Sequence, residues 1–326
     1  MLTRRTLLLA AAAIALSRGA YGQRSSDKPA RIGFLGTGSA SGMAIWLEAF
    51  RAGLRELGYH EGKNLAIEYR WADGDYGKAP ALAADLVRLK VDIIVTHGTP
   101  GTRAAKAATT QIPIVMASAG DAVLVGLVKS IARPGGNVTG STFFNPELAA
   151  KRIELLKQAM PSISRIAALI NPQNAAMGPV LDAMEPVARK LNLDLQRFPV
   201  RAAAELEPAF SAMAEKKVHA AVIIEDGLLN AQTQAIAALA SAKRLPIIGL
   251  PEIAEAGGMM AYGVSFPDMY RRAAVFVDKI LKGAKPDDLP IERPTRFELI
   301  INTSAAKRLG IAIATPVLLR ADRVIE

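Results

Sequence analysis

From about residue 30 onward, two patterns of apolar and polar positions alternate along this 326-residue chain. Short apolar runs such as 31–35 and 91–95 predict strands. Between them, apolar residues recur every three or four positions, which is typical of amphipathic helices. Runs that are apolar on both faces, such as 91–95, indicate parallel strands covered by helices on both sides. The alternation predicts an α/β fold.

The second half of the chain repeats the plan of the first. Strands are predicted at 31–35, 65–71, 91–95 and 112–117, and then at 165–170, 194–198, 218–224, 246–250 and 297–301. Helices are predicted at 43–57, 79–89, 175–191, 203–216, 229–243 and 268–281. We therefore expect two similar lobes, each a doubly wound parallel sheet, joined by a hinge around a ligand cleft. The expected lobes are 30–141 plus about 265–293, and 142–264 plus about 294–326.

Residues 1–22 have the pattern of a cleaved export signal. Arg4 and Arg5 precede an apolar run at 7–16, and the small residues Ala20 and Gly22 follow it. Ten apolar residues reach about 15 Å as a helix, roughly half of a bilayer core, which argues against a permanent membrane span. The paired arginines fit either a twin-arginine or a Sec signal. The signal predicts a periplasmic protein.

Composition narrows the class of protein further. Apolar residues make up 51% of the chain, which supports a sizeable core and excludes global disorder. The absence of cysteine excludes disulfides, thiolate metal sites, cysteine nucleophiles and a lipid-anchored cysteine. The net charge is +10, but the basic residues are scattered and aromatic residues are only 5%, so no nucleic-acid partner is expected. We expect a free monomer that binds a small molecule.

Hydroxyl groups follow several predicted strands. Ser39 and Ser41 lie in the glycine-rich loop 36–42, and His97, Thr99 and Ser118 follow two further strands. Hydroxyls and free N–H groups at helix N-termini suit a carboxylate or a phosphate. Alternatively, the two serines cap a tight turn and Thr99 caps the helix that begins near Pro100. The glycines of loop 36–42 match a dinucleotide fingerprint only in part, because the last spacing is one residue too long.

Three acids also occupy predicted strand exits. Asp121, Asp226 and Glu252 could each accept a hydrogen bond from a ligand ammonium or hydroxyl group, or stabilise the first turn of its own helix. Asp226 lies between an apolar strand and Gly227, which makes it the strongest ligand candidate of the three. We find no nucleophile elbow, phosphate-binding loop or metal-ligand spacing, so no metal, no cofactor and no catalytic residue are predicted.

Many ordered segments of the chain resemble one protein family. They include Ile32-Gly-Phe-Leu35, Ala49-Phe-Arg-Ala-Gly-Leu-Arg-Glu-Leu-Gly-Tyr59, Ile67-Glu-Tyr-Arg-Trp-Ala72, Arg133-Pro-Gly-Gly-Asn-Val-Thr-Gly140 and Lys279-Ile-Leu-Lys-Gly-Ala-Lys-Pro286. This pattern resembles the solute-binding proteins of ABC transporters described as the tryptophan/tyrosine type. The resemblance implies a type I periplasmic-binding-protein fold whose two lobes, joined by three crossovers, close on a small ligand. It also implies an ABC permease in the inner membrane as partner.

The resemblance also implies roles for single residues. Related amino-acid binders suggest Ser39, Ser41, Thr99 and Ser118 for the ligand carboxylate, and Asp226 for its ammonium group. The chain has Glu225-Asp226-Gly227 where similar sequences often have Pro-Asp-Pro. It also has no aromatic residue at 250–253, where similar sequences often carry them, which predicts few aromatic walls around the ligand.

The leading hypothesis is a periplasmic receptor of an ABC importer that binds a carboxylate-bearing solute, either an amino acid or an aromatic or other organic acid. A ligand-binding module for a sensor kinase or chemoreceptor has the same sequence features. An exported dinucleotide-dependent oxidoreductase would use loop 36–42. A cytoplasmic sugar-responsive repressor shares the fold, but this chain has an export signal where the DNA-binding headpiece would sit.

Overall fold

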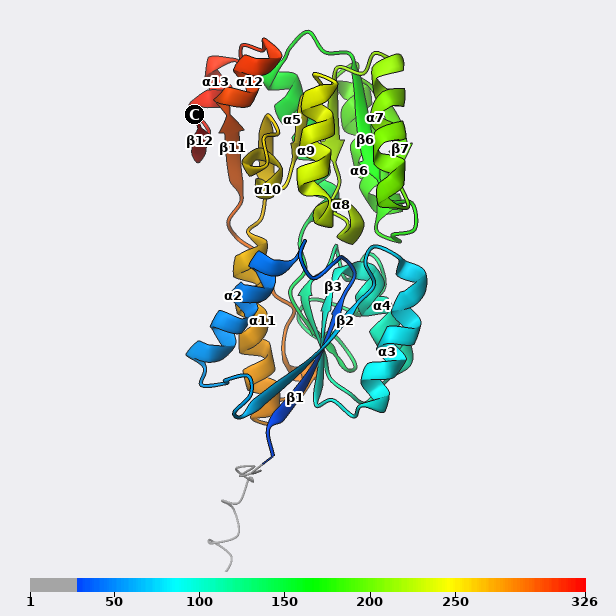
Figure 1. The fold of residues 1–326 in the computed structure, drawn as a ribbon, viewed down its shortest axis with the longest axis vertical. Coiled ribbons are helices and arrows are strands. Elements are labelled where there is room, and N and C mark those ends of the chain that lie inside the picture. Colours follow the sequence, from blue (N-terminus) through cyan, green and yellow to red (C-terminus); the bar gives the residue numbers. More distant parts are fainter. Residues whose placement is uncertain (1–27) are drawn as a thin grey trace, which may run out of the picture.

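The computed structural model describes residues 28–326 and contains two α/β lobes stacked end to end (Figure 1). The predicted export signal, 1–22, lies outside the described residues. Each lobe has its own sheet, and helices cover the sheet faces. This confirms the predicted fold class. Within residues 28–326, no helix combines the length and the apolar character needed to cross a bilayer.

The first lobe is built on a five-stranded parallel sheet with the order β2-β1-β3-β4-β5. Its strands are β1 (Ala30–Gly36), β2 (Leu65–Trp71), β3 (Ile93–His97), β4 (Ile114–Ser118) and β5 (Val138–Gly140). Its helices are α2 (Ala44–Glu56), η1 (Tyr76–Lys78), α3 (Ala79–Arg88), α4 (Gly98–Ala108), α11 (Phe266–Leu281) and η3 (Pro286–Asp288). Helix α11 is distant in sequence but packs along α2 (Figure 1).

The second lobe is built on a seven-stranded sheet with the order β12-β11-β10-β9-β8-β6-β7. Its strands are β6 (Arg165–Ile170), β7 (Asp194–Pro199), β8 (Ala220–Ile223), β9 (Ile247–Gly249), β10 (Met260–Gly263), β11 (Glu298–Asn302) and β12 (Arg323–Ile325). Its helices are α5 (Asn145–Ala159), α6 (Met177–Lys190), η2 (Ala203–Glu205), α7 (Leu206–Glu215), α8 (Gly227–Ala231), α9 (Thr233–Ala242), α10 (Pro251–Glu255), α12 (Thr303–Leu309) and α13 (Thr315–Leu318).

One strand pair departs from the predicted parallel arrangement, because β10 and β11 are antiparallel. The connection between them explains the difference. Strand β10 runs toward the first lobe, and the chain then forms α11 there before it returns. It therefore enters β11 from the seam between the lobes and runs in the opposite direction.

The chain passes between the lobes three times, after β5, after β10 and before β11. Two of these connections are bonded to each other: Ser141 forms a parallel bridge with Glu292, and the Thr142 N–H donates to the Glu292 carbonyl at 2.9 Å. The three segments 141–144, 264–265 and 291–297 form the connection between the two sheets.

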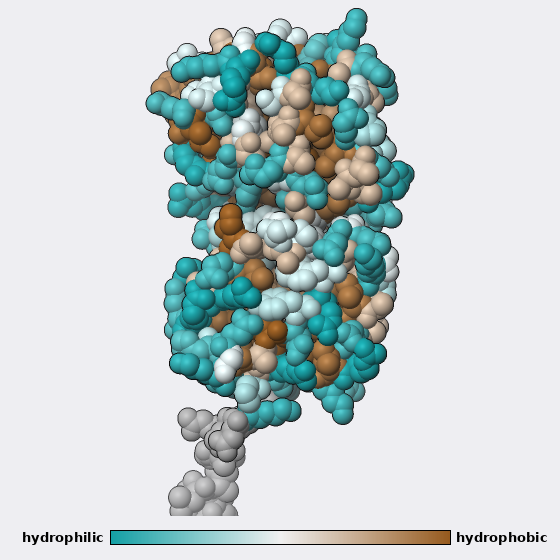
Figure 2. Space-filling model, in the orientation of Figure 1, coloured by the Kyte–Doolittle hydropathy of each residue, from teal (hydrophilic) through white to brown (hydrophobic). Residues whose placement is uncertain are grey.

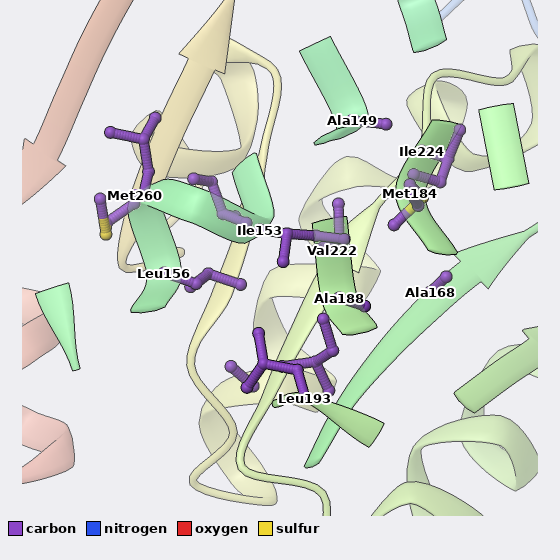
Figure 3. Close-up of a cluster of buried hydrophobic side chains, with 14 of the residues drawn as sticks. Ala149, Ile153, Leu156, Ala168, Met184, Ala188, Leu193, Val222, Ile224 and Met260 are labelled. Carbon is purple, nitrogen blue, oxygen red and sulfur yellow. The ribbon is translucent and has the colours of Figure 1, made fainter. Parts of the chain in front are cut away.

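Each lobe has a dense apolar core. In the second lobe, Ile153 and Leu156 of α5 pack against Val222 of β8 and Met260 of β10 (Figure 3). Val222 and Met260 are completely buried, as expected for central strands that helices cover. This burial supplies most of the driving force for folding and fixes the ends of the strands that reach the seam.

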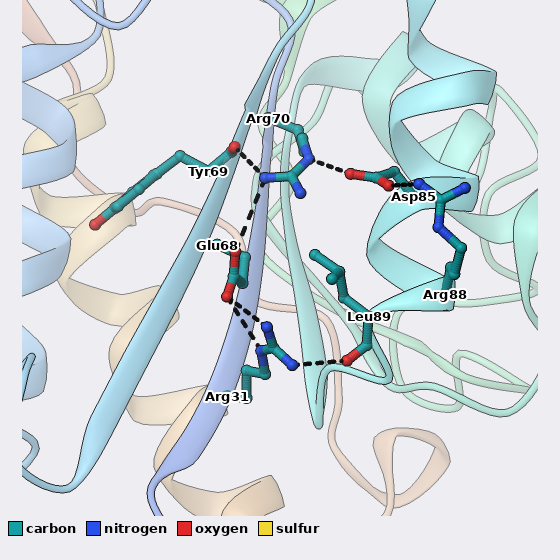
Figure 4. A network of polar contacts seen from close by, with 7 residues as sticks. All are labelled: Arg31, Glu68, Tyr69, Arg70, Asp85, Arg88 and Leu89. Carbon is teal, nitrogen blue, oxygen red and sulfur yellow. Dashed lines mark hydrogen bonds and ion pairs between the residues drawn. The ribbon is translucent and has the colours of Figure 1, made fainter.

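A polar network links the strands and one helix of the first lobe (Figure 4). The Arg31 Nε–H donates to Glu68 Oε1 at 3.1 Å, and the Arg70 Nε–H donates to Asp85 Oδ2 at 2.5 Å. Arg88 also pairs with Asp85. The hydrogen bond from Arg70 is the main cause of the lowered pKa of Asp85. The network ties β1 and β2 to α3.

Candidate functional site

A small cavity of about 20 Å³ lies at the seam, where strand ends of both lobes meet. This is the position predicted for a ligand site, outside the carboxyl ends of parallel strands. The residues that line the cavity come from both lobes and from the connections between them. They are His97, Gly98, Thr99, Ser118, Gly120, Phe143, Asn145, Asn174, Ala176, Glu225, Asp226, Gly227, Asn230 and Phe266. Of the predicted site residues, His97, Thr99, Ser118 and Asp226 therefore come together here.

The first lobe contributes hydrogen-bond donors. Helix α4 begins at Gly98 (φ 74°), directly after β3, and its first turn carries N–H groups without intrahelical partners. Thr99 lies in that turn, and His97 rather than Thr99 is the N-cap. The Thr99 Oγ1 is buried and has no hydrogen-bond partner among residues 28–326. A buried hydroxyl without a partner is costly, and this one is available to donate to an acceptor in the cavity.

His97 lines the cavity as a neutral ring. It is completely buried, and burial lowers the pKa of its imidazole to about 3. Its Nδ1 lies 3.0 Å from the Ser118 Oγ and 2.7 Å from the Tyr270 hydroxyl. The ring stacks on Trp46 with a centroid distance of 5.4 Å. His97 therefore positions the Ser118 hydroxyl and contributes an uncharged aromatic surface.

The prediction of few aromatic walls is wrong. Phe143 and Phe266 line the cavity together with His97. The ring centroids of Phe143 and Phe266 are 5.4 Å apart. Trp46 packs edge-on against Phe266, with a distance of 4.9 Å between the ring centroids. Neither phenylalanine follows a strand that carries a predicted site residue, because Phe143 lies in a connection between the lobes and Phe266 begins α11. The aromatic surfaces therefore come from the crossing segments rather than from the strand exits.

Asp226 lies on the second-lobe side of the cavity and is fully hydrogen-bonded. Its Oδ1 accepts from the Leu228 N–H (2.9 Å) and the Asn171 Nδ2 (3.1 Å). Its Oδ2 accepts from the Tyr76 hydroxyl (2.6 Å) and the Asn174 Nδ2 (3.0 Å). Burial raises the pKa of this carboxyl, and the four hydrogen bonds oppose that shift. Asp226 lines the cavity and is also the N-cap of α8, so of the two roles that the sequence left open the helix role is the one observed, and its ligand contact stays a prediction.

Four further polar residues of the wall, Asn145, Asn174, Glu225 and Asn230, were not among the predicted site residues. Glu225 is paired with the buried Arg152, and its Oε2 has no hydrogen-bond partner among the described residues; the same holds for Asn145 Oδ1. Glu225 occupies the same strand exit as Asp226, and this position could have identified it. Asn145 lies at the end of the first connection between the lobes, where the sequence carried no signal.

The remaining predicted site residues lie outside the cavity lining. Ser39 Oγ accepts from the Gly42 N–H at 3.2 Å and contacts the exposed Ser41, as the turn interpretation predicts. Asp121 Oδ1 accepts from the N–H groups of two nearby turn residues, Val123 and Leu124. Glu252 is half-buried; desolvation of its carboxyl group raises the pKa, and its Oε1 accepts from the Trp46 Nε1–H at 2.8 Å. Ligand contacts for these four residues stay predictions.

Glycines allow the two lobes to approach each other closely. A Cβ atom on Gly38 would lie 2.8 Å from the Gly227 carbonyl oxygen, and one on Gly42 would lie 2.7 Å from the Ala231 Cα. A Cβ atom on Gly227 would collide with the Thr37 Oγ1. Figure 2 shows this seam as a waist where pale and brown residues gather between largely teal lobes. Close packing of the lobes therefore explains Gly38 and Gly42, and packing against Trp71 within the first lobe explains Gly36, without a dinucleotide.

Residues 28–326 contain no group of three or more histidine, aspartate or glutamate side chains arranged to hold a metal ion. The polar groups of the cavity are hydroxyls, amides, carboxylates, backbone N–H groups and the neutral imidazole of His97. Such a set is suited to hold a small polar solute by hydrogen bonds.

Comparison with known proteins identifies the family of the chain. The family model described as ABC transporter substrate binding protein matches residues 38–325. A protein named tyrosine-binding protein from Clostridioides difficile (strain R20291) is 28% identical over 265 residues, which cover 81% of this chain and 76% of that protein.

Two solved structures are similar over almost the whole fold. One is an ABC domain in complex with L-Trp from Streptococcus pneumonia, with a TM-score of 0.83. The other is a conserved domain protein from Vibrio cholerae O1 biovar El Tor, with a TM-score of 0.85. Each is 28% identical, and each comparison covers 91% of this chain and 100% of the other.

Proposed function

Because this chain belongs to the family of ABC transporter substrate-binding proteins, we propose that it captures a carboxylate-bearing amino acid or aromatic acid between its lobes. The observation that carries this proposal is the unpartnered Thr99 hydroxyl in a cavity that the Phe143 and Phe266 rings also line. A tyrosine-binding relative and a similar structure with L-Trp support the same class of solute.

The donors of the first lobe suit the solute carboxylate. The Thr99 hydroxyl, the Ser118 hydroxyl and the N–H groups at the start of α4 lie together on the first-lobe side of the cavity. Charge-assisted hydrogen bonds from such donors are about twice as strong as neutral ones. The α4 macrodipole adds favourable positive potential on this side. The aromatic rings would then pack against the body of the solute.

Binding requires the lobes to separate and close again. A cavity of about 20 Å³ has room for roughly one water molecule, which is far less than any amino acid needs. We assign the moving bodies to residues 30–141 plus about 265–293, and 142–264 plus about 294–326. The connecting segments between them would act as the hinge.

The closed receptor would deliver its solute to an ABC permease. Substrate-binding proteins of ABC transporters work in the periplasm or outside the cell, and the export signal predicted at 1–22 favours the periplasm for this one. We assign it as a monomeric receptor without catalytic activity. A sensor module would bind the same solute, and co-purification with a permease rather than with a kinase or chemoreceptor distinguishes the two roles.

A thermal-shift screen of the exported chain against amino acids, aromatic acids and short dicarboxylates tests the proposal, since binding raises the melting temperature by mass action. Thr99→Val then tests the site by calorimetry. We expect it to weaken the best carboxylate probe by about tenfold or more, because the hydrogen bond to a charged group is lost. The matched control is Thr110→Val, at an exposed position just beyond the end of α4, with unchanged affinity expected. Absence of any hit among carboxylates would overturn the proposal.

A further inference from the structure

Glu225 lines the cavity and has a buried carboxylate oxygen without a hydrogen-bond partner among the described residues. The residue lies just beyond the end of β8, lines the cavity and has a side chain that is 2% exposed. Its Oε1 accepts a hydrogen bond from the Arg152 Nη2. Its Oε2 has no partner among residues 28–326. A buried carboxylate oxygen without a donor is unfavourable, so its presence at a binding cavity points to a ligand group.

Arg152 holds this carboxylate in place. Its side chain on α5 is completely buried, and there the Nε–H donates to the Tyr262 carbonyl at 2.8 Å and the Nη1–H to the Ile223 carbonyl at 3.3 Å. The guanidinium is therefore anchored to β10 and β8, and it supplies the counter-charge for Glu225. It bonds to Oε1, which leaves Oε2 as the acceptor still available.

The neighbouring Asp226 cannot serve a ligand in the same way. A carboxylate has about four lone-pair positions, and the Asp226 oxygens already accept four hydrogen bonds. Any ligand donor would have to displace one of them. Of the two acids at this strand exit, Glu225 is the one with free acceptor capacity.

The charge of this wall favours a cation. Arg152 balances one acid, whereas Glu225 and Asp226 both face the cavity. Asn145 also lines it with an unpartnered Oδ1, but an amide can present either a donor or an acceptor, so it does not decide the charge of the ligand. An ionised carboxylate only accepts. A positively charged donor gives it the strongest hydrogen bond.

We propose that Glu225, positioned by Arg152, is the specificity-determining residue that selects solutes with a protonated amine. This inference rests on the proposed function and narrows it from carboxylates in general to amino acids. The carboxylate of the solute lies at Thr99 and its ammonium group donates to Glu225 Oε2. Asp226 holds the wall together through its four donors and contributes no selectivity for the amine.

Calorimetry with matched probes tests this assignment. The probes are L-tryptophan with indolepropionate and L-tyrosine with hydroxyphenylpropionate, in which each second compound lacks only the amine. The proteins are the exported wild-type chain, Glu225→Gln and Asp226→Asn. Wild type should prefer an amino acid over its deaminated partner by about tenfold or more, and Glu225→Gln should remove most of that preference. Asp226→Asn is the comparison variant, and it should weaken both members of a pair by similar factors.

The outcomes separate the inference from the proposed function. Equal affinity of wild type for both members of a pair, or a preference that survives in Glu225→Gln, overturns the role of Glu225 while carboxylate binding still stands. Failure of all four probes to bind wild type overturns both. If Glu225→Gln does not fold, the wild-type comparison alone still decides whether the site recognises the amine.

Discussion

The Tyr76 hydroxyl of the first lobe donates a 2.6 Å hydrogen bond to the Asp226 carboxylate of the second. Both groups are buried, and burial next to Asp226 raises the pKa of the Tyr76 phenol well above its usual value. The phenol therefore stays protonated and remains a donor. This bond, together with the one from Trp46 to Glu252, directly links the two lobes in the closed arrangement.

Tyr76→Phe should weaken solute binding because it removes a bond that forms only when the lobes close. It also leaves Asp226 Oδ2 with one donor fewer, which costs about 1–3 kcal/mol in a buried site. We expect calorimetry with L-tryptophan to show an affinity lower by about fivefold or more. Tyr69→Phe is the matched control, since the Tyr69 hydroxyl bonds to Arg51 within the first lobe. Equal affinities of the two variants would contradict the closure role.

Gly42→Ala should prevent the two lobes from packing as closely as they do here. Its Cβ would lie 2.7 Å from the Ala231 Cα, a contact that the closed lobes cannot accommodate without shifting apart. We expect affinity to fall by about tenfold or more while the melting temperature of the protein without solute changes little, because each lobe keeps its core. Gly178→Ala in α6 is the control, as a Cβ there meets no atom within 4 Å. An unchanged affinity in Gly42→Ala would show that solute binding does not need the lobes to pack this tightly.

Much of the fold follows from local patterns. The apolar runs identify strands β1, β3 and β6 because covered parallel strands bury both faces. The predicted helix 229–243 is instead two helices, α8 and α9, which are separated at Gln232. The first of them begins at Gly227, before the predicted start, because the Asp226 side chain caps it there. The strand at 297–301 was predicted and is β11, but its antiparallel direction was not, because that direction depends on the return of the chain from the first lobe.

The site is predictable only where it lies on strand ends. Parallel strands of one sheet share an edge, which groups Thr99 with Ser118, and the expected facing of the two lobes brings Asp226 to them. Phe266 could not be grouped with them, because it reaches the cavity only after the chain crosses back to the first lobe. The free oxygen of Glu225 depends on Arg152, which comes from a helix distant in sequence, and no local pattern encodes that pairing.

His97 should make the protein less stable in mild acid. The pKa of this imidazole is about 3 in the folded protein, against an ordinary value of 6.5. Below pH 6.5 the unfolded chain binds a proton that the folded protein does not, so the free energy of unfolding falls as the pH decreases toward 3. The slope approaches about 1.4 kcal/mol per pH unit.

Urea unfolding of wild type and His97→Gln at about pH 7 and about pH 5 measures this contribution. Wild type should lose about 2 kcal/mol more than the variant between the two pH values. The other histidines, His60 and His219, are present in both proteins, so their titration cancels in the difference. Identical losses in the two proteins would show that His97 can be protonated in the folded state.

Arg152→Met should destabilise the second lobe far more than the loss of an ordinary ion pair. The Arg152 and Glu225 side chains are 0% and 2% exposed, so the substitution leaves a buried carboxylate without its counter-charge. We expect urea unfolding to show a loss of about 3–5 kcal/mol. Adding Glu225→Gln removes the uncompensated charge and should restore part of that loss. Lys151→Met provides the control, because Lys151 pairs with Glu154 at a partly exposed position, where the pair contributes at most about 1 kcal/mol. A double variant no more stable than Arg152→Met alone would mean that Arg152 stabilises the lobe through its backbone carbonyl contacts rather than through Glu225.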